Sequence, residues 1–103
     1  MRTLAKISFP VEAGNAAIQA GTLPQLIQST IDKLKPEAAY FFADHGQRSA
    51  LIVFDLKSPS DIPSIAEPFF IGANASVEFI PVMNADDLKT GLGKLSNGAA
   101  AVR

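Results

Sequence analysis

The sequence has no cysteine and no tryptophan, and it has a single histidine, His45, and a single tyrosine, Tyr40. The lack of cysteine excludes disulfides, thiolate nucleophiles and cysteine metal sites, and it is typical of the reducing cytoplasm, where we expect the protein to reside. With one histidine, only carboxylates remain as further metal ligands. They show no ligand spacing, so we expect no metal site. No Gly-x-Ser-x-Gly elbow and no complete glycine-rich phosphate loop is present, and we expect no cofactor.

Charge is also scarce. The chain is 18% charged, its net charge is −1, and its nine basic residues are scattered along the sequence. Such a distribution offers no electrostatic footprint for a phosphate backbone, so we expect no nucleic acid partner. The uncharged stretch 13–31 includes Asn15, Gln19, Gln25 and Gln28 and is too polar to span a bilayer. The apolar run after Lys6 is too short for a signal peptide, so we expect no membrane partner.

Apolar residues, by contrast, are plentiful. They make up 48% of the 103 residues, and the mean hydropathy is +0.20. A chain of this length forms one domain, which we place at residues 1–95, with a flexible C-terminal tail at 96–103. A small domain buries a limited share of its surface, so the apolar excess favours a partner that covers some of it.

The N-terminal third predicts one strand followed by helix. Alternating apolar residues predict a strand over Thr3–Phe9, and an alanine-rich segment predicts a short helix over Ala13–Gly21. Thr22 and Gln25 have the spacing of a capping box, so Thr22 is expected to cap a second helix. Its apolar stripe repeats at helical spacing as far as Leu34.

The middle of the chain predicts a hairpin and another helix. The runs Ala38–Ala43 and Arg48–Leu56 are rich in aromatic or branched residues, and the turn between them contains Gly46. A helix is expected to begin at Ser58, because a proline follows it in the first turn. Pro68 is expected to kink or shorten that helix.

The last predicted strand, Val77–Met83, contains Pro81, which argues for the edge of a sheet. The order β-α-β-β-α-β then predicts an α+β fold: a ferredoxin-like plait with a four-stranded antiparallel sheet and two helices on one face. In that plait the strand order is fourth, first, third, second, and the fourth strand is an edge. A short C-terminal helix is predicted over Asn84–Leu95, with Asn84 as its cap.

The second face of this sheet is predicted to be partly apolar. Period-two alternation sends the following residues away from the helices: Leu4, Lys6, Ser8, Leu51, Val53 and Asp55. A face left in water would be more polar than this, so something is expected to cover it. Two coverings remain open: a second copy packed sheet to sheet, or the C-terminal segment with Leu88, Leu92 and Leu95. Both can hold if the segment reaches a neighbouring copy.

In its element order and its half-apolar second face, the range Thr3–Met83 resembles the dimeric α/β-barrel superfamily of ferredoxin-like domains. The resemblance implies a closed homodimer with a cavity between the two sheets. Members include cofactor-free monooxygenases, lactone isomerases and small proteins without known activity. The segments Lys35–Tyr40 and Pro81–Leu88 also resemble an uncharacterised bacterial family, and this second likeness implies no chemistry.

Four residues are candidates for lining such a cavity. Lys6 and Asp55 are predicted on adjacent central strands of the second face, where burial would perturb their pKa values. The alternative is a cross-strand ion pair on a wet surface. Tyr40 and Glu78 line the same space in one of two possible registers. His45 is a weaker acid/base candidate, because a hairpin turn favours a solvated side chain.

Three functions follow from these expectations. The first is a homodimer, paired through the sheet face, that binds a small, partly apolar molecule between the sheets. The second is a cofactor-independent monooxygenase or isomerase acting on an aromatic or lactone-like compound, with Lys6, Asp55 and Tyr40 in the cavity. The third is a regulatory or assembly module. No sequence motif decides whether the chain is an enzyme.

Overall fold

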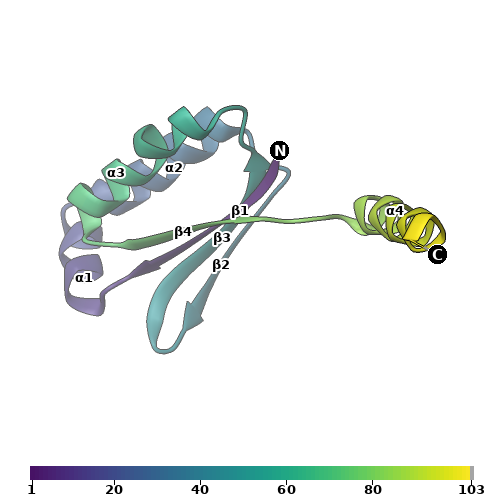
Figure 1. Cartoon of the computed structure of the whole chain (residues 1–103). Helices are drawn as coiled ribbons and strands as arrows, with labels where there is room; N and C mark the ends of the chain where they lie inside the picture. Colours follow the sequence, from purple (N-terminus) through teal and green to yellow (C-terminus); the bar gives the residue numbers. More distant parts are fainter. Residues whose placement is uncertain (103) are drawn as a thin grey trace.

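The computed structural model describes residues 1–102, and the side chains of residues 1–95. The fold is α+β, with one four-stranded antiparallel sheet. The strands are β1 (Arg2–Phe9), β2 (Ala38–Asp44), β3 (Gln47–Asp55) and β4 (Ser76–Pro81). The helices are α1 (Val11–Gln19), α2 (Thr22–Leu34), α3 (Ile62–Ala73) and α4 (Ala85–Val102), with a short 3-10 turn, η1 (Pro59–Asp61), before α3. Helices α1, α2 and α3 lie on one face of the sheet (Figure 1).

The strands lie in the order β2-β3-β1-β4. This is the order that the sequence analysis predicts, with β4 at an edge. Pro81 pairs with Thr3 at the end of β4. A proline is tolerated at this position because an edge strand has one side on which no amide must donate to a neighbouring strand.

The hairpin between β2 and β3 turns through His45 and Gly46, and the ladder begins with Asp44 opposite Gln47. Both turn residues have positive φ, 53° at His45 and 75° at Gly46. A two-residue turn of this kind matches the twist of the strands on either side of it. The predicted hairpin is therefore confirmed, and its register is fixed by a tight turn.

The junction between α1 and α2 differs from the prediction. Gly21, with φ of 78°, occupies the N-cap position of α2, and no side chain caps this helix. The Thr22 hydroxyl instead donates to the backbone carbonyl of Ala17 at 3.2 Å. The predicted Thr22 cap is wrong, because a left-handed glycine turns the chain one residue earlier and makes Thr22 the first residue of the helix.

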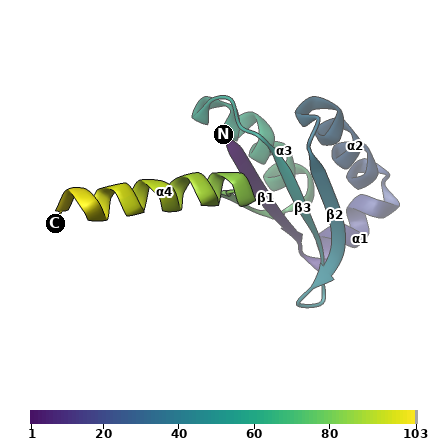
Figure 2. The same ribbon diagram turned by 90° about the vertical axis from the view of Figure 1, so that its right-hand side faces the viewer.

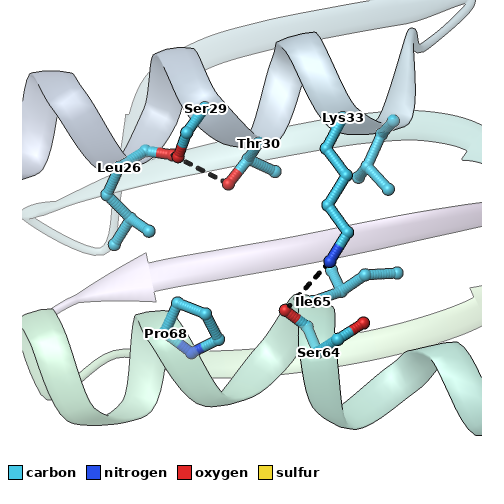
Figure 3. Close-up of a pocket in the computed structure, with 8 residues that line it drawn as sticks. Leu26, Ser29, Thr30, Lys33, Ser64, Ile65 and Pro68 are labelled. Atoms are coloured by element: carbon cyan, nitrogen blue, oxygen red, sulfur yellow. Dashed lines mark hydrogen bonds between the residues drawn. The ribbon is translucent and has the colours of Figure 1, made fainter.

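Helix α3 continues through Pro68 to Ala73. A proline within a helix cannot donate to the carbonyl four residues before it, which here belongs to Ser64. The Lys33 ammonium group of α2 donates to that carbonyl at 3.4 Å, as Figure 3 shows. Lys33 therefore replaces the hydrogen-bond donor that Pro68 lacks, and this explains why α3 continues past Pro68.

The core lies between the sheet and the three covering helices. Its centre is formed by one side of β1 and β3 and the facing sides of α2 and α3, and Phe54 and Phe69 are each at most 2% exposed. Aromatic contacts tie the layers together, with the ring centroids of Phe9 and Phe69 6.1 Å apart. The remaining core members are mainly small or branched: Ala5, Ile7, Ala17, Leu23, Ala50, Ile52, Ile65, Ala73 and Ala75.

Helix α4 projects away from the rest of the molecule (Figures 1 and 2). The sequence prediction ended this helix at Leu95, but it continues to Val102. It does not cross the sheet of its own chain, so the second face is not covered in that way. Residues 96–102 of the predicted flexible tail, 96–103, belong to this helix, and Arg103 lies outside the described residues. Within residues 1–102, no helix has the length and apolar character needed to span a membrane.

Candidate functional site

The open face of the sheet is the surface formed by strand residues that point away from α1, α2 and α3. Strand register arranges its central part in three cross-strand rows. From β2 to β4 these rows are Ala38-Val53-Leu4-Ile80, Tyr40-Leu51-Lys6-Glu78 and Phe42-Ser49-Ser8-Ser76. The facing of Tyr40 and Glu78, which the sequence left open by one residue of register, is thereby resolved in favour of the open face.

The open face is apolar along its first row and at the β2 edge, where Tyr40 and Phe42 lie, whereas the other two rows also carry charged residues or serines. Tyr40 is 65% exposed, Ile80 42% and Phe42 38%. Leu4, Leu51 and Val53 in the central strands are half-buried by their neighbours alone. Large apolar side chains at these exposures are characteristic of interaction surfaces when they lie side by side.

Lys6 lies near the centre of the open face and pairs with Asp44, the last residue of β2. The Lys6 Nζ and the Asp44 Oδ2 are 3.3 Å apart. The hydrogen bond from Lys6 is the main reason that the pKa of Asp44 lies below its usual value, with a smaller contribution from His45 and against the opposing effect of burial. Lys6 thus favours the charged form of Asp44.

Asp55 lies on the same face but does not meet Lys6. Register places Lys6 opposite Leu51 and Asp55 opposite Arg2, so the two candidates are in separate rows. Asp55 accepts a hydrogen bond from the Met1 amine at 2.6 Å. That bond lowers the pKa of Asp55. The sequence correctly placed both residues on one face, but the structure gives each a different partner.

Arg2 connects the sheet to the start of α4. Its guanidinium contacts Glu37 and, at 3.1 Å, Asp87, and the pairing with Glu37 is the main cause of its raised pKa. Asp87 also accepts from the backbone amide of Asn84, while the Asn84 side chain accepts from the amide of Asp87. This reciprocal cap confirms the predicted role of Asn84, and together with Arg2 it fixes where α4 leaves the body.

Tyr40 and Glu78 flank the Leu51–Lys6 pair in the middle row of the open face. Glu78 is directly opposite Lys6 on the edge strand β4, and Tyr40 lies on the other edge strand, β2. Three of the four predicted cavity residues therefore share one row, and they provide an ammonium, a carboxylate and a phenol within an apolar surface.

His45 stands at the tip of the β2–β3 hairpin with 88% of its side chain exposed. Its Nδ1 lies 3.0 Å from the Asp44 Oδ1. A base at an open turn has no walls to hold a substrate against it. The position favours the solvated histidine over a catalytic one.

A pocket that the sequence analysis did not identify lies on the other side of the sheet. It is about 440 Å³ in volume and opens between the α1–α2 corner and β2. We call it the Arg48 pocket. Its lining is Phe9, Ile18, Leu23, Pro24, Ile27, Gln28, Phe41, Phe42, Arg48 and Ser49. The signal in the sequence was the alternation of β2, which points Phe41 towards the helices at an edge that they cover incompletely.

A smaller hollow of about 200 Å³ lies between α2 and α3. Figure 3 shows Lys33 reaching across it to Ser64, with Leu26 and Pro68 on its two sides. Lys33 is committed to the Ser64 carbonyl, so we assign this hollow to helix packing. Among residues 1–102, no three histidine or carboxylate side chains gather in a way that could hold a metal ion.

The geometry of the open face suits binding. Lys6 is paired with Asp44, and an apolar row from Ala38 to Ile80 lies beside the polar middle row. Comparison with known protein families finds no matching family, and comparison with curated proteins finds no similar protein. The site therefore has to be interpreted from its own residues.

Proposed function

We propose that this protein acts as a homodimer of ferredoxin-like plaits, in which two open faces are apposed and α4 of each copy lies against the other copy. The observation that carries the proposal is that two separate apolar surfaces are exposed in the single chain. The open face is uncovered in its own chain, and α4 presents Leu88, Leu92 and Leu95 at exposures of 47%, 55% and 68%. These leucines are spaced so that they form one stripe on the helix.

The dimensions of the two surfaces fit each other. Four strands are about 19 Å wide at the usual strand spacing, and the 18 residues of α4 are about 27 Å long. The sheet footprint is on the order of 400 Å², about half of what each partner buries in a standard interface. An arm that crosses the partner supplies the missing area, which makes α4 a necessary part of the dimer.

Apposed open faces would enclose the middle row of each copy between the two sheets. Lys6, Tyr40 and Glu78 then supply a few polar groups in a largely apolar space, which is the usual character of a small-molecule site. We propose that this space holds a small, partly apolar molecule. The apolar surroundings contribute affinity, and the phenol and the two charges orient the ligand.

The dimer is tested by light scattering during size-exclusion chromatography at micromolar concentration. The expected mass is twice the 10.9 kDa of the chain, and Leu92→Ser should shift the protein towards the monomer because it removes the middle of the stripe. Ile71→Ser is the matched control, since Ile71 is 83% exposed on the outer side of α3 and should leave the mass unchanged. A monomeric natural chain, or equal effects of the two substitutions, would contradict the proposal.

A further inference from the structure

The Arg48 pocket is apolar on its walls and is not closed by the chain itself. Phe9 and Leu23 are buried at its base, while Ile18 and Phe41 on its walls are 43% and 51% exposed. Folding normally buries side chains of this size more fully. The pocket lies mainly on the helix side of the sheet, and Phe42 and Ser49 are the lining residues that it shares with the open face.

Arg48 places one cation in this apolar surface, and its side chain is held in position. Its Nη1 donates to the Asn15 Oδ1 at 3.0 Å. A Cβ at position 14 would lie 3.0 Å from the same nitrogen, so Gly14 makes room for the guanidinium against α1. Guanidinium groups offer five donors, and one bond to an amide oxygen leaves the others for a ligand.

The guanidinium of Arg48 has no carboxylate partner among the described side chains. Of the side chains that the structure describes, no Asp or Glu forms an ion pair with it, in contrast to Arg2 and Lys6. A half-buried guanidinium beside phenylalanine and isoleucine is a good site for an anion that brings its own apolar body. The positive charge of Arg48 attracts the anionic end of such a molecule, and the apolar walls contact its other end.

We propose that the Arg48 pocket binds a small organic carboxylate, with its carboxylate group on Arg48 and its apolar body between Ile27 and Phe41. The volume of about 440 Å³ lies in the lower half of the usual range for small-molecule sites, which suits a single ring or a short branched chain. This site centres on Arg48, borders the open face only at Phe42 and Ser49, and goes beyond the proposed dimer.

The probe for this proposal is 3-phenylpropionate, and its neutral counterpart is 3-phenylpropan-1-ol. Titration of the 15N-labelled full chain should shift the amide signals of residues around the pocket, including Ile27 and Phe41, and leave those of Lys6 and Val53 on the open face unchanged. The alcohol should bind about tenfold more weakly, because it forms no charge-assisted bond with the guanidinium.

Variants separate the roles of the two ends of the pocket. Arg48→Met retains a long, unbranched side chain but removes its charge. It should lower the affinity for 3-phenylpropionate about tenfold without changing the affinity for the alcohol. Asn15→Ala removes the acceptor that holds the Arg48 guanidinium in position, and it should weaken the binding of 3-phenylpropionate by less than about tenfold. Lys57→Met is the control for loss of a positive charge elsewhere and should bind as the natural chain does. Thermal unfolding of each variant verifies that it is folded.

Four results would overturn the proposal. The first is equal affinity for the acid and the alcohol, and the second is unchanged binding to Arg48→Met. The third is a set of shifts centred on the open face, or no shift at millimolar probe. The fourth is binding to the Leu92→Ser variant but not to the natural chain, because α4 of a second copy would then be the occupant of the pocket.

Discussion

The two faces of the sheet are built from the same strands and differ in almost every physical respect. On the covered face, Ala5, Ile52 and Phe54 are at most 2% exposed. On the open face, the neighbouring positions keep apolar side chains partly in water and carry the shifted titratable groups. The difference indicates that the covered face supplies the stability of the single chain, whereas the open face is available for function.

The sharpest comparison of the faces uses two consecutive residues of β3. Ala50 is 2% exposed on the covered face, and Leu51 is half-buried on the open face. Ala50→Asp should destabilise the fold by about 5 kcal/mol or more, enough to unfold a small domain, because the new charge has no water and no partner. Leu51→Asp should cost the single chain about 1–2 kcal/mol, because Leu51 is only half-buried and water reaches the new charge.

Circular dichroism with urea denaturation distinguishes the two variants. The Leu51→Asp chain should be folded and monomeric, because the charge would be buried between apposed sheets. If both variants are equally unfolded, the open face also stabilises the single chain, and the proposed difference between the two faces is wrong.

A second pair removes the same side chain from each face. Phe54→Ala should lower the free energy of unfolding by about 3–5 kcal/mol, since it leaves a cavity in the core. Phe42→Ala should lower the free energy of unfolding by clearly less in dilute solution, because Phe42 on β2 is 38% exposed. Denaturation over a range of protein concentrations is the measurement. In a dimer the cost of Phe42→Ala rises with concentration, whereas that of Phe54→Ala does not.

Much of the fold could be predicted because its signals are local. The β2–β3 turn needs Gly46, the edge position of β4 tolerates Pro81, and the reciprocal bonds of Asn84 and Asp87 start α4. Period-two alternation also separated the two faces of the sheet correctly. Each of these predictions depends on residues within a few positions of one another, where sequence spacing is close to spatial distance.

The partner of Lys6 could not be predicted in the same way. The hairpin turn fixes the register of β2 against β3, but the partners in β1 and β3 are far apart in the sequence, and alternation defines their register only to within two residues. Asp44 and Asp55 both point to the open face, and each lies two rows from Lys6. The Lys6 side chain contacts Asp44, whereas Asp55 pairs with the Met1 amine, and spacing along the sequence does not distinguish these two outcomes.

The Arg48 pocket and the course of α4 were missed for a related reason. The pocket depends on where the α1–α2 corner rests on the sheet, and Gly21 moves that corner relative to the predicted Thr22 cap. Helix α4 was expected to end at Leu95 because residues 96–103 are small and polar and were expected to fray. Its path away from the body depends on Arg2 and Asp87, which are far apart in the sequence.

The shifted titratable groups Arg2, Asp44 and Asp55 all belong to the open face. The pKa of Asp44 in the folded chain lies below its ordinary value of 3.8, so the folded state holds this proton less tightly than the unfolded chain does. The contribution of Asp44 to stability is therefore complete above about pH 4 and is lost as the pH falls through the lower, folded-state pKa. The acid sensitivity of the fold should arise on the open face.

The smallest expected effect tests this assignment directly. Lys6→Met removes the donor that contributes most to the shift, so the pKa of Asp44, followed by NMR of its carboxyl carbon, should rise towards 3.8. Lys89→Met removes a lysine from α4 and should leave that pKa where it is in the natural chain. If the two variants give the same pKa for Asp44, then His45 or the hairpin backbone keeps the carboxylate charged. In that case Lys6 would be free to meet a ligand on the open face, and the middle row would have a different polar chemistry from the one that its ion pair now gives it.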